Sequence, residues 1–281
     1  MGYGIWVMGC SIHLSSLISH NSYRPLTKRI VPSLEMLTEE NPTSRKKTGR
    51  LAGFLYIIMG IASAFGIMYV PSKIIVWGNA NITCQNIITH ELLFRMGMVS
   101  QFVSNGLFIL LVFVLYRLFK QVNSSQARLM VAMVLVQVPI GFLIESFNMT
   151  SLLILKGDIM KTLSMEQKRD WVMLFLTMHK YGMITIEIFS GLWLIPFGLL
   201  VFNSKFIPRI FGILLIIGGI AYVIESLTFW ISPDIQPVVS RFMMILYTIG
   251  ETPIIFWLLI KGTKSVVKDN NKSNKNRAYE T

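Results

Sequence analysis

The segment MHKYGMITIEIFSGLWLIPFGLLVF, residues 178–202, is long and apolar enough to cross a lipid bilayer as a helix. It nevertheless contains three ionisable side chains, those of His179, Lys180 and Glu187. An ionised side chain in the hydrocarbon core costs at least about 2.5–3.5 kcal/mol, so each needs a partner, water or a function that justifies it. The segment therefore predicts both a membrane fold and a polar site inside it.

Five further runs of the chain have the same character. The predicted spans are 51–70, 96–116, 129–150, 178–202, 210–232 and 239–260. Of the 281 residues, 53% are hydrophobic and 14% are charged, whereas soluble domains contain about 25% charged residues. The runs are continuous rather than alternating, which favours helices over the strands of a membrane barrel. The sequence therefore predicts an all-α, polytopic membrane helix bundle with about six transmembrane helices.

Basic residues are unevenly distributed between the predicted loops. Eighteen of the 26 Lys and Arg residues lie on one side, in residues 1–50, 117–128, 204–209 and the tail from 261. Seven lie in the loops of the other side, and Lys180 is the last. Because cytoplasmic loops carry an excess of Lys and Arg, both termini are predicted to be cytoplasmic. Membrane topology then explains the net charge of +12, and no nucleic acid partner is expected.

The composition divides the chain into three parts. Residues 1–49 are predicted to be a cytoplasmic, mostly disordered extension, 50–262 the six-helix transmembrane domain, and 263–281 a basic, disordered cytoplasmic tail. The start of the chain lacks the basic region of a signal peptide, and Met36 is a natural alternative start.

Six ionisable residues in the predicted spans make up the candidate polar cavity: Glu187, Glu251, Glu145, Glu225, His179 and Lys180. In the predicted topology the four glutamates fall in the outer half of the membrane, with the two basic residues near the outer interface. Lys180 and Glu187 are seven residues apart and share nearly one helix face. A simpler interpretation is also open: the glutamates would only bond neighbouring helices, and Lys180 would only reach for water.

Three functions fit these residues. The favoured one is binding or transport of a cation, a proton or a small polar molecule through the acidic outer-half cavity. The alternative is a structural or regulatory membrane protein whose buried acids serve only helix packing. The least favoured is a membrane-embedded, metal-dependent enzyme that uses His90, His179 and the glutamates. No HExxH or GxSxG motif occurs, so the sequence predicts no catalytic residue, no cofactor-binding residue and no cofactor, and leaves metal binding open.

Several stretches resemble a known family. They are RLAGFLY (50–56), NIITHELLFRMG (86–97), HKYG (179–182) and SKFIPRIFGILLIIGG (204–219), together with Tyr222. They are similar to the bacterial multi-pass membrane proteins described as domain of unknown function 4386, and the similarity covers residues 50–262. Its most specific elements are HxYG and PRxxGxLL, while Phe211 stands where an aliphatic residue is expected. The resemblance supports the six spans and implies no activity. The apolar runs themselves predict a multi-pass protein of the cell membrane, with the lipid bilayer as partner.

Overall fold

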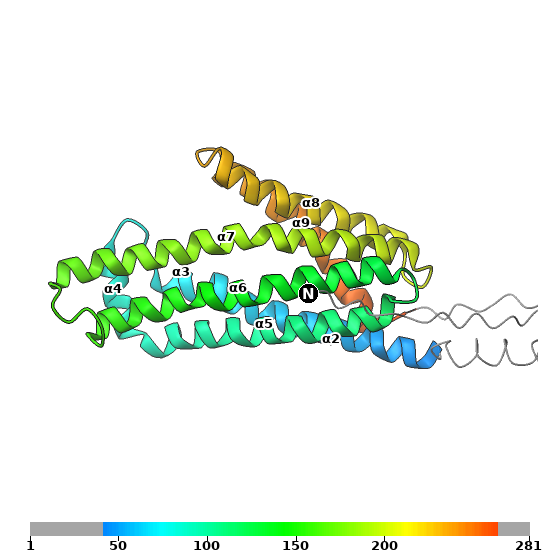
Figure 1. The fold of residues 1–281 in the computed structure, drawn as a ribbon, viewed down its shortest axis with the longest axis horizontal. Helices are drawn as coiled ribbons and strands as arrows, with labels where there is room; N and C mark the ends of the chain where they lie inside the picture. The colour runs from blue at the N-terminus through cyan, green and yellow to red at the C-terminus, as the bar shows by residue number, and fades with distance from the viewer. Residues whose placement is uncertain (1–41, 264–281) are drawn as a thin grey trace, which may run out of the picture. The chain divides into compact units, whose positions relative to one another are not determined.

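A computed structural model describes residues 42–263, in which every regular element is helical. The elements are α2 (Pro42–Ala64), the π-helix η1 (Phe65–Tyr69), α3 (Val70–Ile74), α4 (Ala80–Thr89), α5 (Glu91–Phe119), α6 (Ser124–Lys156), α7 (Met165–Asn203), α8 (Arg209–Ile231) and α9 (Gln236–Ile260). Six helices of the described chain are long and apolar enough to cross a membrane. The predicted all-α membrane bundle of about six spans is therefore confirmed (Figure 1).

The helices extend beyond the predicted spans. α7 has 39 residues, about 58 Å at 1.5 Å per residue, against a hydrocarbon core of about 30 Å. Helix α2 already begins at Pro42, so the last residues of the predicted disordered extension, up to 49, are helical instead. The remainder of that extension and the predicted tail lie outside the described residues.

Local sequence sets where the helices begin and end. The Asn123 side chain accepts hydrogen bonds from the N–H groups of Ser125 and Gln126 and so caps the start of α6. Gly157 ends α6 in the left-handed conformation, with φ of 75°, which glycine adopts without steric cost. At the start of α7, Ser164 and Gln167 form a capping box, in which each side chain bonds the other's backbone N–H.

The six long helices form a ring. Each packs against the next in the order α2, α5, α6, α7, α8 and α9, and α9 returns to α2. We call the end where α2 begins the terminal end, and the opposite end, which carries α4, the α4 end. One apolar core lies towards the terminal end and contains Phe108, Trp193 and Phe197. A second lies at the α4 end, where Ile87 of α4 packs on α6 and α7 residues such as Leu152.

Helices α7 and α8 approach each other most closely at two pairs of glycines. A Cβ atom built at Gly198 would stand 2.7 Å from the carbonyl oxygen of Gly212, and one at Gly212 would stand 2.6 Å from that of Gly198. A Cβ at Gly219 would likewise stand 2.9 Å from the carbonyl oxygen of Gly191. The two glycines on each helix, Gly191 and Gly198 of α7 and Gly212 and Gly219 of α8, are seven residues apart, so they lie on one face of that helix. This contact is the small-residue packing by which helices associate in lipid.

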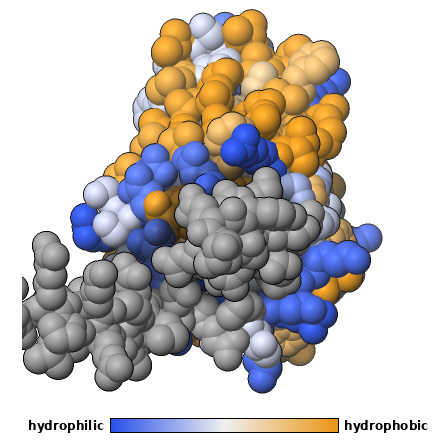
Figure 2. Space-filling model, turned by 90° about the vertical axis from the view of Figure 1, so that its right-hand side faces the viewer, coloured by the Kyte–Doolittle hydropathy of each residue, from blue (hydrophilic) through white to orange (hydrophobic). Residues whose placement is uncertain are grey.

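The surface of the bundle is divided in the way a membrane requires. Figure 2 looks onto the terminal end, where hydrophilic residues gather. Above them, in the region that α8 and α9 occupy in Figure 1, the surface is mostly hydrophobic. Such an apolar flank is stable only against lipid, so the bundle implies a bilayer environment.

The uneven distribution of basic residues predicts which end faces outward. In a cysteine-free variant, single cysteines at Asn81 and Asp234, both exposed at the α4 end, should react with a membrane-impermeant maleimide in intact cells. A cysteine at Ser125, exposed at the terminal end, should react only after lysis. In the wild-type protein, Cys84 is buried, and burial raises the pKa of its thiol, so its labelling should be weak. Labelling at position 125 alone would place the α4 end in the cytoplasm.

Candidate functional site

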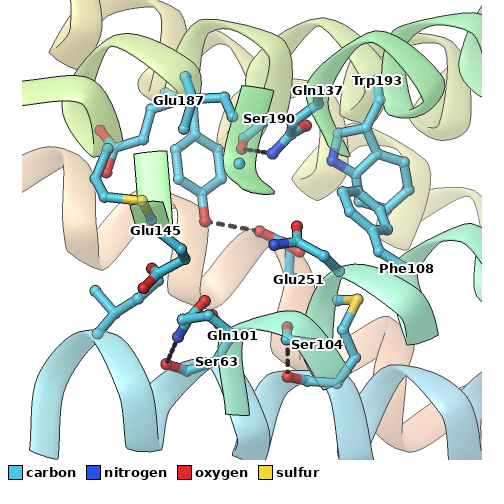
Figure 3. Close-up of a pocket in the computed structure, with 17 residues that line it drawn as sticks. Ser63, Gln101, Ser104, Phe108, Gln137, Glu145, Glu187, Ser190, Trp193 and Glu251 are labelled. Carbon is cyan, nitrogen blue, oxygen red and sulfur yellow. Dashed lines mark hydrogen bonds between the residues drawn. The ribbon is translucent and has the colours of Figure 1, made fainter. Parts of the chain in front are cut away.

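A cavity of about 210 Å³ lies between the two apolar cores, and all six spans line it. Its polar lining consists of Ser63, Gln101, Ser104, Asn105, Gln137, Glu145, Glu187, Ser190, Tyr222 and Glu251. Figure 3 shows side chains from several helices converging on this space, with Glu251 near its centre, Gln137 and Ser190 on one side and Gln101 and Ser63 on the other. The cavity is roughly an order of magnitude larger than the ~10–15 Å³ that one water molecule needs. It can therefore hold a small molecule.

Glu251 is fixed by two tyrosines from other helices. The Tyr222 hydroxyl of α8 donates to Oε1 over 3.0 Å, and the Tyr56 hydroxyl of α2 donates to Oε2. Tyr222 in turn stacks on Tyr247, with ring centroids 4.0 Å apart. These bonds tie α2, α8 and α9 together at the level of the cavity, so the position of the carboxylate is set by three helices.

Glu145 lies at the side of the cavity nearer the α4 end. It is 2% exposed, and its Oε1 lies 2.9 Å from Nε2 of His179. The Asn148 amide donates to Oε2 over 3.1 Å. Glu145, Asn148 and His179 also line a second, much smaller cavity of about 20 Å³. The carboxylate therefore separates the central cavity from a space that has room for one water molecule.

Glu187 is the carboxylate without a local partner. Its Oε2 is buried and has no hydrogen-bond partner in the described part of the chain. The same is true of Oε1 of Gln137, whose amide nitrogen donates to Ser190 over 2.9 Å. Two acceptor atoms are thus left unsatisfied among the residues that line the cavity, a costly arrangement unless something bonds them.

Two hydrogen-bond donors among the lining side chains bond backbone carbonyl groups of the protein. The amide of Gln101 donates to the backbone carbonyl of Ser63 over 3.0 Å, and the hydroxyl of Ser104 donates to that of Met59 over 3.2 Å. Both carbonyls belong to α2, just before this helix changes to the π-helix η1. Ile67 of η1 also lines the cavity. Single π turns of this kind occur frequently at functional sites.

Three of the six predicted site residues do not line the central cavity: His179 borders only the smaller one, and Glu225 and Lys180 lie elsewhere. Glu225 is buried between α8 and α9, where the Ser240 hydroxyl donates to its Oε1, and it does not line the cavity. Lys180 is exposed, with its ammonium group 4.7 Å from the centroid of the Trp77 ring. Lys180 and Glu187 do share a helix face, but at the level of Lys180 the neighbour of α7 is the segment between α3 and α4. The expectation that the helix turns Lys180 towards the cavity is therefore corrected.

The residues proposed for a metal enzyme do not assemble. His90 lies at the junction of α4 and α5, where its Nδ1 is 3.2 Å from the Asn86 carbonyl oxygen, and it does not line the cavity. Among residues 42–263, no group of three His, Cys, Asp or Glu side chains could hold a metal ion.

Only part of this site could be predicted from the amino-acid pattern. A polar stripe on one helix face is visible for Gln101 and Asn105, and again for Gln137 and Glu145. Tyr56 gave no such signal, because it lies in an apolar run, where a tyrosine is typical of packing. Aromatic residues that line the cavity, such as Trp193, are also common in membrane-spanning helices, so they gave no signal of a site either.

The stretches that carry the family resemblance hold the site together. In HKYG, His179 contacts Glu145, and Gly182 packs on a residue of α6. The Tyr181 ring lies tilted against Phe229 of α8, with ring centroids 4.9 Å apart. RLAGFLY contributes Tyr56, the partner of Glu251. A family model with the description Domain of unknown function (DUF4386) matches residues 51–262. No curated protein and no solved structure matches the chain.

Proposed function

The chain belongs to the family described as Domain of unknown function (DUF4386), and we propose that this multi-pass membrane protein binds a small molecule with an ammonium group in its central cavity. With both termini cytoplasmic, as the basic residues favour, the Glu145 side of the cavity faces the outside of the cell membrane.

One observation carries the proposal: the described residues that line the cavity include three carboxylates and no Lys or Arg. Glu145 and Glu251 have protein partners, whereas Glu187 retains an unsatisfied oxygen. The oxygen of Gln137 is the second free acceptor. A ligand that suits this lining donates hydrogen bonds and complements the acidic side chains, and an ammonium group does both.

The apolar part of the lining supports an organic cation rather than a bare metal ion. Phe108, Trp193 and Tyr222 all line the cavity. Aromatic faces attract ammonium groups, and the attraction strengthens where water is excluded. The cavity volume also exceeds what a single ion fills.

Glu187 offers the sharpest test, because the alternative, a purely structural role, predicts a different result. Replacing Glu187 by Gln keeps the size of the side chain and removes the charge. The free Oε2 has no hydrogen bond to lose. We expect Glu187→Gln to retain the thermal stability of the wild type and to weaken binding of n-propylammonium by about tenfold or more, or about 1.4 kcal/mol. Isothermal titration calorimetry on the purified protein in detergent measures this.

Two controls accompany the titration. Propan-1-ol matches the probe in size without the charge, and the wild type should not bind it measurably. Glu166→Gln removes an exposed acid at the start of the same helix and should leave binding unchanged. Equal binding of alcohol and ammonium, or a wild type that binds neither, would refute the proposal. A Glu187→Gln variant that binds normally but unfolds earlier would favour the structural role.

A further inference from the structure

The contact between α2 and α9 is tight at the terminal end of the ring. A Cβ atom built at Gly49 would stand 3.2 Å from the backbone of Gly262. One at Gly53 would stand only 2.7 Å from Cα of Leu259. The two backbones therefore touch here, and nothing can pass between them.

The same face of α2 is open further along. Gly60 follows Gly53 by seven residues and so points in nearly the same direction. A Cβ atom at Gly60, however, would meet no atom within 4 Å. Helix α9 has thus moved away from α2 within two turns.

Burial shows the same separation over a longer distance. Between Tyr56 and Val70, no residue of α2 or η1 is buried. In α9, no residue from 236 to 249 is buried, and the first buried one is Gly250. In Figure 1 the connection between α8 and α9 accordingly stands clear of the other helices. The ring is therefore open to lipid between α2 and α9, along the half towards the α4 end.

This lateral gap leads to the acidic cavity. Its α2 edge supplies Met59, Ser63 and Ile67 to the cavity lining. Its α9 edge ends at Glu251, whose bond to Tyr56 marks the point where the two helices separate. A molecule in the gap would therefore meet the carboxylate of Glu251 at the inner end of the gap.

The elements on either side of the gap carry large exposed apolar side chains, in contrast to the cavity. On α2, η1 and α9 these include Ile61 at 65%, Met68 at 63% and Phe242 at 63% of their full exposure. Hydrocarbon is the natural neighbour of such side chains, and an ammonium group is the natural neighbour of the cavity.

We infer that the ligand is a membrane amphiphile with a cationic amino head group, which enters sideways from the bilayer and leaves its hydrocarbon chain between α2 and α9. The inference rests on the proposed function, since the head group occupies the acidic cavity. It adds the substrate class and the route: the ligand comes from the lipid phase.

Closing the gap with one side chain tests the inference. In Gly60→Trp the indole has open space to occupy, so the protein should fold normally while the gap is filled. Gly106→Trp is the matched control, because a Cβ at Gly106 also meets nothing within 4 Å, but this residue of α5 does not line the cavity. Both variants and the wild type are placed in phosphatidylcholine nanodiscs with radiolabelled n-propylammonium bound, and dodecylammonium is added as the competitor.

For Gly60→Trp, we expect the half-displacing concentration of dodecylammonium to rise about tenfold, while propylammonium affinity stays within about twofold. Gly106→Trp should match the wild type in both. If propylammonium binds and dodecylammonium competes equally well in all three proteins, the lateral route is wrong and the proposed function stands. If the wild type fails to bind propylammonium, the proposed function itself fails. A wild type that is dimeric through this gap and monomeric as Gly60→Trp would show that a second copy fills it, which also overturns the inference.

Discussion

Replacing His179 by alanine is expected to destabilise the bundle by about 3 kcal/mol, because it leaves the Glu145 carboxyl without its main partner. Glu145 is 2% exposed and His179 14%, so water does not readily replace the lost bond. Asn148 still donates to Oε2 and limits the loss. Thermal unfolding of the purified protein in detergent measures the effect.

The adjacent Lys180 provides the control. It is ionisable and lies on the same helix, but its side chain is exposed and contacts the Trp77 ring at the surface. Lys180→Ala should change stability by less than about 0.5 kcal/mol. Adding Glu145→Gln to His179→Ala should recover part of the loss, since the buried carboxyl group is then gone. Equal effects of His179→Ala and Lys180→Ala would contradict a structural role for the His179–Glu145 pair.

Enlarging Gly212 should have the largest effect on folding. A Cβ atom there would lie 2.6 Å from the Gly198 carbonyl oxygen and 2.6 Å from the backbone nitrogen of Phe202. Backbone atoms cannot rotate away, so α7 and α8 must separate. Overpacking typically costs about 1–3 kcal/mol, and we expect Gly212→Leu to exceed that range and Gly212→Ala to fall within it. Thermal unfolding and the yield of folded protein in detergent report both.

Gly106→Ala should act in the opposite direction. Its new methyl group meets nothing within 4 Å, and alanine in a helix is favoured over glycine by about 0.5–1 kcal/mol. A stabilised Gly106→Ala beside a destabilised Gly212→Ala would separate the packing effect from helix propensity. A Gly212→Ala variant as stable as the wild type would show that the helix contact can relax.

The family elements acquire a physical reason in this structure. Gly212 of PRxxGxLL is the glycine that lets α8 touch α7, and Gly53 of RLAGFLY lets α2 touch α9. His179 of HxYG pairs with Glu145. The resemblance alone could not assign these roles, because a motif gives the residue and not the atom that faces it.

The chain by itself determined the membrane fold. Apolar runs of sufficient length predict the six spans, because lipid offers no hydrogen bonds and each span must satisfy its own backbone as a helix. The same rule predicts that buried acids such as Glu145, Glu187 and Glu251 must find partners. Helix α4 and the π-helix Phe65–Tyr69 were not predicted, since the first is short and the second lies within a continuous apolar run.

Only the tertiary structure decided which partner each buried acid contacts. Periodicity gives the face of a helix, but not the neighbour at each level along it. Glu251 of α9 thus reaches Tyr56 of α2, which is 195 residues away in sequence, while Glu225 of α8 turns to Ser240 of α9. Likewise, Gly53 and Gly60 look alike in sequence, yet one contacts the backbone of α9 and the other meets open space. That difference depends on the angle between α2 and α9, which the packing of all six helices sets together.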